Sequence, residues 1–298
     1  MMAWILRGLK EGVVTTSYPK RPDGYGDSYK GALRVSTSPP AAPEGDSAAA
    51  AQATAIASCC PTGAIEQHPA QEGLSGQPHL SVDRGRCILC GICVQSYPEL
   101  FYFEPSTETS KLARHSLVVP EIEEGDAQLS AVRADLARRV KALRRSVHIR
   151  HVDAGSDGSE EWEVAALLNP VYDIHRLGLF FTASPRHADL LLVTGTGTAG
   201  MAGPLKRTYE AMPYPKIVMA AGTDAISGGI VHPTYSTHPG IAGLVPVDIW
   251  VPGSPPSPFA ILHGILAGLG LLSRSCGAKI ARQDAVAHGP SGSKGAPR

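Results

Sequence analysis

The segment Leu190-Leu-Leu-Val-Thr194 runs directly into Gly195-Thr-Gly-Thr-Ala-Gly200, and a helical stretch follows over Gly203–Met212. A short apolar run, a glycine-rich turn and a helix make a strand–turn–helix unit. Further apolar runs of strand length surround this unit, and a buried helix is expected after the last of them. These segments are Leu179–Thr182, Ile217–Ala221, Val247–Val251 and the helix Pro258–Leu272. Strands that alternate with helices predict an α/β unit with a mainly parallel sheet.

The composition limits the classes of protein to be considered. The chain has 298 residues, with 27 Lys+Arg against 27 Asp+Glu, a length that allows roughly two domains. A balanced charge argues against a nucleic-acid-binding protein, which normally carries a basic field. No apolar run reaches the roughly 20 residues of a membrane span. Residues 1–6 lack the cationic start of a signal peptide, so no leader is expected.

Changes in composition along the chain predict six segments. A Pro-, Ser- and Ala-rich stretch is typical of a linker, and apolar residues at three- and four-residue intervals predict an amphipathic helix. The segments are an N-terminal helix with an extended stretch (1–35), a low-complexity linker (36–54), a cysteine-rich domain (55–120), an amphipathic connecting helix (121–147), the α/β domain (148–275) and a disordered tail (276–298).

Five of the six cysteines fall within residues 55–105, and their spacing predicts an iron–sulfur site. Cys87-Ile-Leu-Cys90-Gly-Ile-Cys93 is a C-x₂-C-x₂-C run. In bacterial ferredoxins this run continues with x₃-C-P, and that fourth cysteine binds the other cluster. Here Tyr97-Pro98 stands in its place, whereas upstream Cys60-Pro61 has the ending of such a motif.

Counting back from Cys60 by the same spacing gives Ile56, Ala53 and Ala50 where three further cysteines would stand. One motif therefore keeps its fourth cysteine and the other keeps its first three. By the crossed ligation rule these four thiolates belong to one cluster. The prediction is a single 4Fe–4S cluster. Its ligands are Cys60, Cys87, Cys90 and Cys93.

Zinc is the main alternative for these cysteines, since paired C-x-x-C motifs also hold that metal. The third cysteine at x₂ spacing favours iron–sulfur instead. Disulfides are disfavoured because no leader directs the chain to an oxidising compartment. Cys59 is interpreted as a small buried residue beside Cys60, and Cys276 is given no role.

Two known families resemble different parts of the chain. Residues 1–110, with Gly12-Val-Val-Thr-Thr-Ser-Tyr-Pro19 and the cysteine motifs, resemble the ferredoxin-like subunit of formate hydrogenlyase and complex I. Residues 146–272 resemble the small electron-transfer subunit of complex I and group 4 nickel–iron hydrogenases. That second resemblance is carried by blocks such as Leu168-Asn-Pro-Val-Tyr-Asp173, Ala225-Ile-Ser-Gly-Gly229 and Val251-Pro-Gly253. The chain is similar to a fusion of the two subunits. The resemblance implies an α+β ferredoxin-like domain followed by an α/β domain with a flavodoxin-like sheet.

The second resemblance also carries a departure from its family. The small subunit holds a 4Fe–4S cluster of its own on four cysteines, and other residues stand at the matching positions here. They are Asp157, Glu160, Asp224 and Ser254. Hard oxygen ligands suit Mg²⁺ or Ca²⁺ rather than iron–sulfur. Two interpretations remain for this degenerate site: a pocket of solvated polar groups, which is favoured, and a hard-cation site.

The turn Gly195-Thr-Gly-Thr-Ala-Gly200 also matches the dinucleotide-binding pattern G-x-G-x-x-G, with Asp224 in range as the acidic residue. That pattern is weak by itself, and the resembled family binds no nucleotide at this turn. Glycines that allow close packing of the turn and the helix are the favoured interpretation. No arrangement of a nucleophile with a base is visible, so no catalytic residue is predicted.

The first functional hypothesis is an electron-transfer subunit with one 4Fe–4S cluster in a membrane-associated complex related to hydrogenases and complex I. The resemblance implies a hydrogenase-like large subunit and integral membrane subunits as partners, with a redox donor protein possible and no nucleic acid. It implies a cytoplasmic protein, peripheral on the inner face of the cell membrane through those partners. The alternative is a mainly structural scaffold subunit of a hydrogenase-related or antiporter-like complex.

Overall fold

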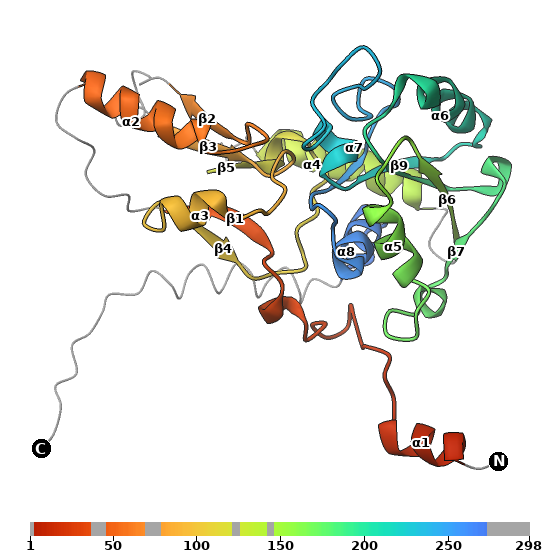
Figure 1. Cartoon of the computed structure of the whole chain (residues 1–298). Helices are drawn as coiled ribbons and strands as arrows, with labels where there is room; N and C mark the ends of the chain where they lie inside the picture. The colour runs from red at the N-terminus through yellow and green to blue at the C-terminus, as the bar shows by residue number, and fades with distance from the viewer. Residues whose placement is uncertain (1–2, 37–45, 69–78, 121–125, 142–145, 273–298) are drawn as a thin grey trace, which may run out of the picture.

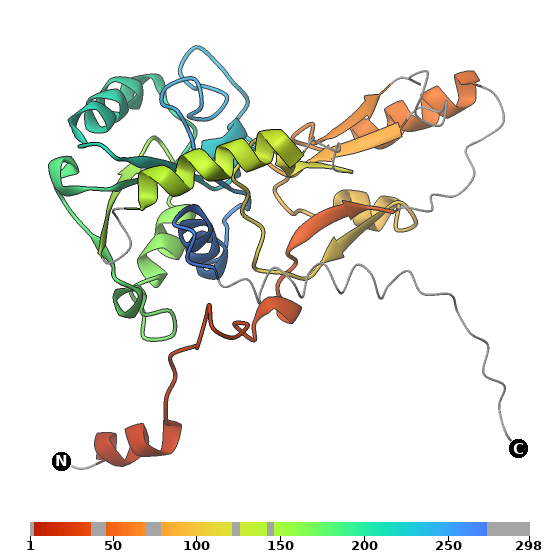
Figure 2. The ribbon, with the colours of Figure 1, turned by 180° about the vertical axis from the view of Figure 1, so that it is seen from behind.

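A computed structural model describes residues 3–36, 46–68, 79–120, 126–141 and 146–272 (Figure 1). In both views two regions lie side by side. One, built from β1–β5, α2 and α3, holds the cysteines, and the other surrounds a larger sheet (Figures 1 and 2). The first helix, α1 (Ala3–Glu11), stands away from both regions.

The larger sheet has five strands in the order β10-β9-β8-β6-β7, and every neighbouring pair is parallel. β8 and β9 are buried along their whole length, which explains their continuous apolar sequences, since helices cover both faces of a parallel sheet. The predicted parallel α/β unit is thus confirmed. Its strands are β6 (Val147–Asp153), β7 (Leu179–Phe181), β8 (Leu190–Thr194), β9 (Ile217–Ala221) and β10 (Ile249–Val251).

Two layers of helices cover this sheet. α4 (Asp126–Val140), α5 (Ser159–Ala166) and α8 (Pro258–Gly268) pack on one face, and α4 crosses in front of the sheet in Figure 2. α6 (Ala199–Ala211) and α7 (Thr223–Ser227) pack on the other face. α8 is the predicted buried helix, and it begins where the Ser257 hydroxyl accepts a hydrogen bond from Ala260 N at 3.2 Å.

The smaller region is antiparallel. β1 (Ala32–Val35) pairs with β4 (Phe101–Glu104), and β3 (His79–Asp83) lies between β2 (Ile65–His68) and β5 (Val118–Val119). α2 (Asp46–Ser58) precedes β2, and α3 (Ile92–Ser96) precedes β4. The order from β1 to β4 is therefore strand–helix–strand–strand–helix–strand. One apolar cluster, which includes Leu33, Ile56 and Phe101, joins these elements.

Several boundaries differ from those predicted by the sequence. α2 takes in residues 46–54 of the stretch expected to be a linker, because consecutive alanines favour helix. The connecting helix expected over 121–147 is α4, of which residues 126–140 are helical, and 121–125 and 142–145 lie outside the described residues. α6 begins at Ala199 instead of Gly203. The tail at 276–298 lies outside the described residues. The remaining short elements are the 3₁₀ turns Gly26–Ser28, His115–Leu117, Ile174–Leu177 and Pro185–His187.

The two regions are joined by contacts that the sequence pattern did not indicate. Lys111 and Trp250 exchange backbone hydrogen bonds of 2.8 Å at the β10 edge of the sheet. Tyr18, which is 1% exposed, packs into the α/β core with its ring 5.7 Å from that of Phe259. The Arg114 guanidinium pairs with both carboxylate oxygens of Asp83 at 2.8 and 2.6 Å, and it lies 6.0 Å from the ring centroid of Trp250 in β10. Within the described residues, no helix is both long and apolar enough to cross a membrane.

Candidate functional site

The four predicted cluster ligands line one pocket in the smaller region. Cys60 follows the end of α2, Cys87 and Cys90 lie on the loop between β3 and α3, and Cys93 lies in α3. Apolar side chains such as Leu33, Ile65 and Phe103 complete the lining. We call this site, defined by Cys60, Cys87, Cys90 and Cys93, the cysteine pocket.

The loops around the cysteine pocket direct backbone N–H groups at sulfur. Ala64 N donates to Cys60 Sγ at 3.3 Å, and the backbone N–H groups of Leu89 and Val94 donate to the sulfurs of Cys87 and Cys93. Leu89 has a φ of 55° and Gly91 a φ of 85°, so the loop bends through the left-handed region twice within three residues. Hydrogen bonds of this kind stabilise sulfur that carries negative charge, as in a ligated cluster.

Burial controls the charge of these thiols when no metal is bound. It raises the pKa of Cys87 to about 12 and that of Cys93 to about 11. Both thiols are then protonated at neutral pH, because an apolar surrounding disfavours an isolated thiolate. A bound metal reverses this balance, since a coordinating thiol gives up its proton to the positive charge of the ion. The donor set and its apolar lining therefore fit an iron–sulfur cluster.

The positions where the motifs of a two-cluster ferredoxin would have further cysteines differ from the predicted ligands in their surroundings. Ile56, at a position where a partner-cluster ligand would stand, is 3% exposed in the apolar core, and Tyr97 packs against the same core. Cys59 is half-buried beside Cys60 and does not line the pocket. Cys276 lies outside the described residues. Among the described residues, no three His, Cys, Asp or Glu side chains converge as ligands of a single metal ion.

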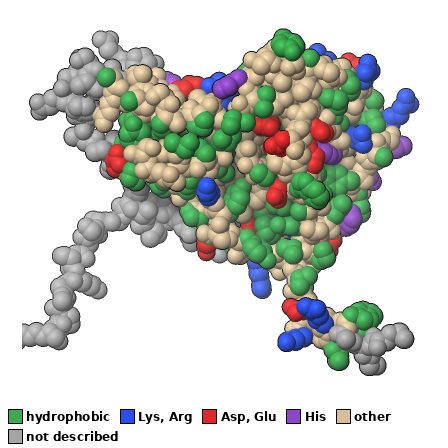
Figure 3. All heavy atoms as spheres, in the orientation of Figure 1, with side chains coloured by type: hydrophobic (Ala, Val, Ile, Leu, Met, Phe, Trp, Pro, Cys, Tyr) green, Lys and Arg blue, Asp and Glu red, His purple; other side chains and the backbone are tan. Residues whose placement is uncertain are grey.

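Three of the four residues of the predicted degenerate site lie together at the carboxyl ends of β6 and β9. Glu160 is fully buried at the start of α5, Asp224 is half-buried in α7, and Asp157 is exposed on the loop before α5. Ser254 is exposed on the loop after β10. Acidic side chains gather near the middle of the face drawn in Figure 3, over α5 and α7. We call Asp157, Glu160 and Asp224 the acidic group.

Electrostatics differ within the acidic group. Burial, together with the nearby charges of Asp224 and Asp157, raises the pKa of Glu160 to about 7. Burial, with Asp157 and Glu161, raises the pKa of Asp224 to about 6. Hydrogen bonds from the Ser159 side chain and backbone lower the pKa of Asp157. Two carboxyl groups of this group are thus biased towards their protonated form.

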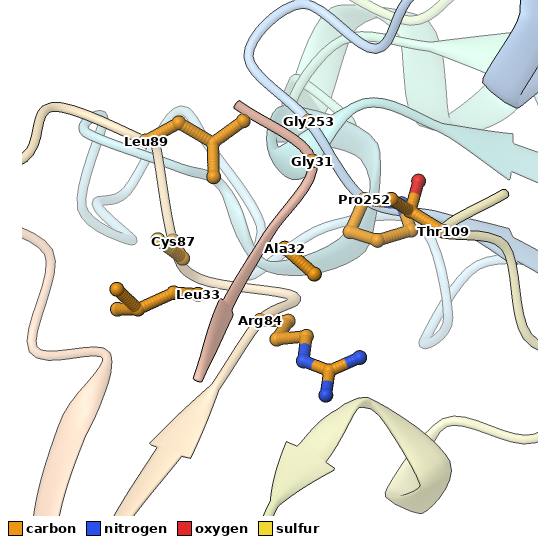
Figure 4. A pocket seen from close by; sticks show the side chains of 9 residues that line it. All are labelled: Gly31, Ala32, Leu33, Arg84, Cys87, Leu89, Thr109, Pro252 and Gly253. Atoms are coloured by element: carbon orange, nitrogen blue, oxygen red, sulfur yellow. The ribbon is translucent and has the colours of Figure 1, made fainter. Parts of the chain in front are cut away.

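The short helix α7 connects the acidic group to the loop of the cysteine pocket. Thr223 Oγ1 donates to the backbone oxygen of Cys87 at 3.2 Å, and Ser227 Oγ donates to that of Gly85 at 2.9 Å. Figure 4 shows the junction at which Cys87, Gly31 and Gly253 come together from distant parts of the chain. Sequence reasoning missed Thr223 and Ser227, because a hydroxyl that bonds a remote carbonyl leaves no pattern in the local sequence.

The glycine-rich turn after β8 packs against its own chain. A Cβ on Gly195 would lie 2.6 Å from the backbone of Gly155 and Ser156, and one on Gly197 would lie 3.1 Å from the Gly240 oxygen. Both glycines have a positive φ. Close approach is found at both positions, but to the backbone of neighbouring loops rather than to the helix that was expected.

Comparison with known proteins matches part of the α/β region to a known family. Residues 158–268 match the family described as NADH ubiquinone oxidoreductase, 20 Kd subunit. The chain is 39% identical over 154 residues to formate hydrogenlyase subunit 7 of Escherichia coli, an alignment that covers 52% of this chain and 59% of that protein. It is 40% identical over 139 residues to the probable membrane-bound hydrogenase subunit mbhJ of Pyrococcus furiosus, covering 47% of this chain and 83% of that protein.

A solved structure titled as the membrane-bound sulfane sulfur reductase, an archaeal respiratory membrane complex, contains a chain that matches with a TM-score of 0.40 and 28% identity. The match covers 49% of this chain and 88% of that one. The chain spans 59% of the formate hydrogenlyase subunit and most of the Pyrococcus furiosus subunit. Since the identity over that nearly whole relative is 40%, the chain belongs to the NADH ubiquinone oxidoreductase 20 Kd subunit family, which includes hydrogenase small subunits.

Proposed function

We propose that the chain is an electron-transfer subunit of a membrane-associated oxidoreductase complex related to complex I and to membrane-bound hydrogenases. It carries one 4Fe–4S cluster on Cys60, Cys87, Cys90 and Cys93. When bound, this cluster supplies one-electron transfer, and a large partner subunit holds any catalytic centre. The chain lies on the inner face of the cell membrane through integral membrane partners.

The observation that carries this proposal is the convergence of four cysteines on one apolar pocket. They come from two motifs separated by more than twenty residues, yet all four line the same cavity. The strand–helix–strand–strand–helix–strand order around them supports a ferredoxin-like domain. N–H groups that point at sulfur and apolar walls favour a cluster over a simple solvent-exposed thiol group.

The partners follow from the names of the relatives. The proteins that match this chain are described as a formate hydrogenlyase subunit and a probable membrane-bound hydrogenase subunit. Small subunits of this kind act in assemblies, and the exposed aromatic side chains Trp162 (79% exposed) and Tyr235 (100% exposed) offer surface for a partner.

A second candidate is a mainly structural scaffold subunit. The acidic group favours it, because the resemblance places these residues where the family's small subunit holds its own cluster. Carboxylates there remove the last relay step towards a large subunit. In this case the remaining cluster serves stability or a different electron donor.

The test is iron and sulfide analysis of the anaerobically purified full-length chain, with EPR of the reduced protein. About four irons per chain and one cluster signal are expected. Cys60→Ala should lose the cluster, whereas the matched variant Cys59→Ala, one residue away, should keep it. A protein without iron after reconstitution would reject the electron-transfer proposal, and about eight irons would reject the single cluster.

A cluster that is present but is not re-oxidised by the large subunit of the assembled complex would favour the scaffold. That measurement uses rapid reduction of the complex and follows the oxidation of the cluster by EPR. Re-oxidation by the large subunit on the timescale of turnover supports the relay.

A further inference from the structure

We propose that the acidic group is a proton-binding site, in which buried Glu160 holds a proton and exchanges it with solvent through Asp224 and Asp157. The ligand is a proton rather than a metal ion. The proposal concerns the α/β region and stands whether or not the cysteine pocket holds iron.

The first observation is the environment of Glu160. Its side chain is 0% exposed, and Oε1 is buried without a hydrogen-bond partner. The other oxygen, Oε2, accepts a hydrogen bond from Ser159 Oγ at 3.1 Å. A charged carboxylate with one oxygen unsatisfied in the interior is costly, so a compensating positive charge or a bound proton is required.

The second observation is the charge of the groups that face Glu160. Asp224 from α7 and Asp157 from the preceding loop act on it, and Asp157 and Glu161 act on Asp224. These neighbours are all acidic. Like charges at close range disfavour simultaneous ionisation, so at least one carboxyl group of the set keeps its proton near neutral pH.

Other ionisable groups in this region interact with different partners. Glu161 accepts hydrogen bonds from Ser156 and Thr194, and His151 lies 3.7 Å from it. On α8, which also packs against α5, His263 bonds Ser110. These contacts leave Glu160 facing carboxyl groups.

The third observation separates a proton from a cation. A Cβ on Gly222 would lie 2.6 Å from Glu160 Oε1, and a Cβ on Gly229 would lie 2.1 Å from Asp224 Oδ1. Both carboxyl groups therefore occupy space that a Cβ at position 222 or 229 would fill. Ca²⁺ requires six to eight oxygen ligands and Mg²⁺ a near-octahedral set. A proton needs one oxygen, which the packed Oε1 still provides.

Burial decreases in steps from Glu160, which is fully buried, to half-buried Asp224 and exposed Asp157. This order gives a proton a route between the interior and solvent. Because α7 also bonds the backbone of Cys87 and Gly85, the site lies beside the loop of the cysteine pocket. A proton taken up here changes the charge next to that loop.

Infrared difference spectroscopy of the full-length chain across pH 4 to 9 tests the proposal. A protonated-carboxyl band that disappears with a midpoint near pH 7 is expected, matching the raised pKa of Glu160. Glu160→Gln should remove this band, and Asp224→Asn should shift its midpoint downward by removing a like charge. Glu210→Gln, at an exposed position of α6, should leave the band unchanged.

Calorimetric titration with Mg²⁺ alone and with Ca²⁺ alone decides between a proton and a cation. Stoichiometric binding of either ion at pH 7.5 that is lost in Glu160→Gln would overturn the proposal. The proposal would also be overturned if every protonated-carboxyl band of the wild-type protein had already disappeared when the pH is raised to 5.5. Because neither measurement depends on iron, failure here is distinct from failure of the cluster experiment.

Discussion

The short helix α7 connects the cysteine pocket with the acidic group, and burial raises the pKa of groups in both, with different consequences. In the cysteine pocket burial holds the pKa of Cys87 near 12, so metal binding has to displace a proton from an apolar site. In the acidic group burial holds the pKa of Glu160 near 7, within reach of ordinary pH changes. The same physical effect thus favours metal capture by soft thiols in one region and proton storage by hard oxygens in the other.

The largest effect should follow removal of a buried thiol from the cysteine pocket. Cys87→Ala should abolish iron binding completely, because three thiolates leave one iron corner without a ligand. Asp224→Ala, in α7, should retain all the iron. Iron and sulfide analysis after anaerobic reconstitution measures both. Equal iron loss in the two variants would show that the two sites are not chemically separate.

A smaller but still large effect is expected at Gly222, which has a φ of 97° and lies against Glu160. Gly222→Ala should destabilise the protein by about 3 kcal/mol, since the backbone conformation and the contact with Oε1 are both unfavourable for a Cβ. Thermal or urea unfolding gives this value.

The double variant Gly222→Ala with Glu160→Ala should recover part of that loss, because shortening Glu160 removes the contact but not the backbone strain. A double variant no more stable than the single one would show that Glu160 does not occupy this space.

The pH dependence of stability tests the proton in the acidic group. The pKa of Glu160 lies above its ordinary value of 4.5, so between pH 4.5 and about 7 the native state binds more protons than the unfolded chain. Stability from this group is fully present below pH 4.5 and falls as pH rises through 7.

Glu160→Gln should therefore be more stable than wild type at pH 8, by about 2 kcal/mol, and nearly equal to it at pH 4.5. Urea unfolding at the two pH values measures the difference, with Glu210→Gln as the exposed control. A constant difference between wild type and variant at both pH values would contradict a proton on Glu160.

The smallest effect concerns the ion pair between Asp83 of β3 and Arg114. Asp83→Asn keeps the shape of the side chain but weakens its two contacts with Arg114, whose side chain is 33% exposed. A loss of about 1 kcal/mol is expected for a partly exposed pair. Glu66→Gln, in the more exposed pair with Arg86, should change stability by less than about 0.5 kcal/mol. Thermal unfolding compares the two variants. A larger loss of stability in Glu66→Gln would show that the pair of Asp83 with Arg114 is not the more stabilising of the two.

Much of the architecture could be predicted from the sequence, because its signal is local. The apolar runs at 190–194 and 217–221 are buried strands because a parallel sheet covered on both faces needs nothing but apolar side chains. The spacing of Cys87, Cys90 and Cys93 predicts three thiols close together, which lie on one loop and the first turn of α3, and the spacing of the ferredoxin motif matches Cys60 to them. The limits of the helices are less predictable. The composition of residues 46–54 predicts a linker, but these residues form part of α2.

The tertiary structure alone decided which residues from distant parts of the chain share an environment. Nothing near Tyr18 in the sequence indicates that it packs on Phe259, and nothing near Thr223 indicates a bond to Cys87. The sequence placed an acid at position 160. Its complete burial against Gly222 depends on how α5 meets the end of β9. The sequence determines the chemical identity of each residue, whereas the pKa and the accessibility of a side chain depend on the neighbours that the fold brings to it.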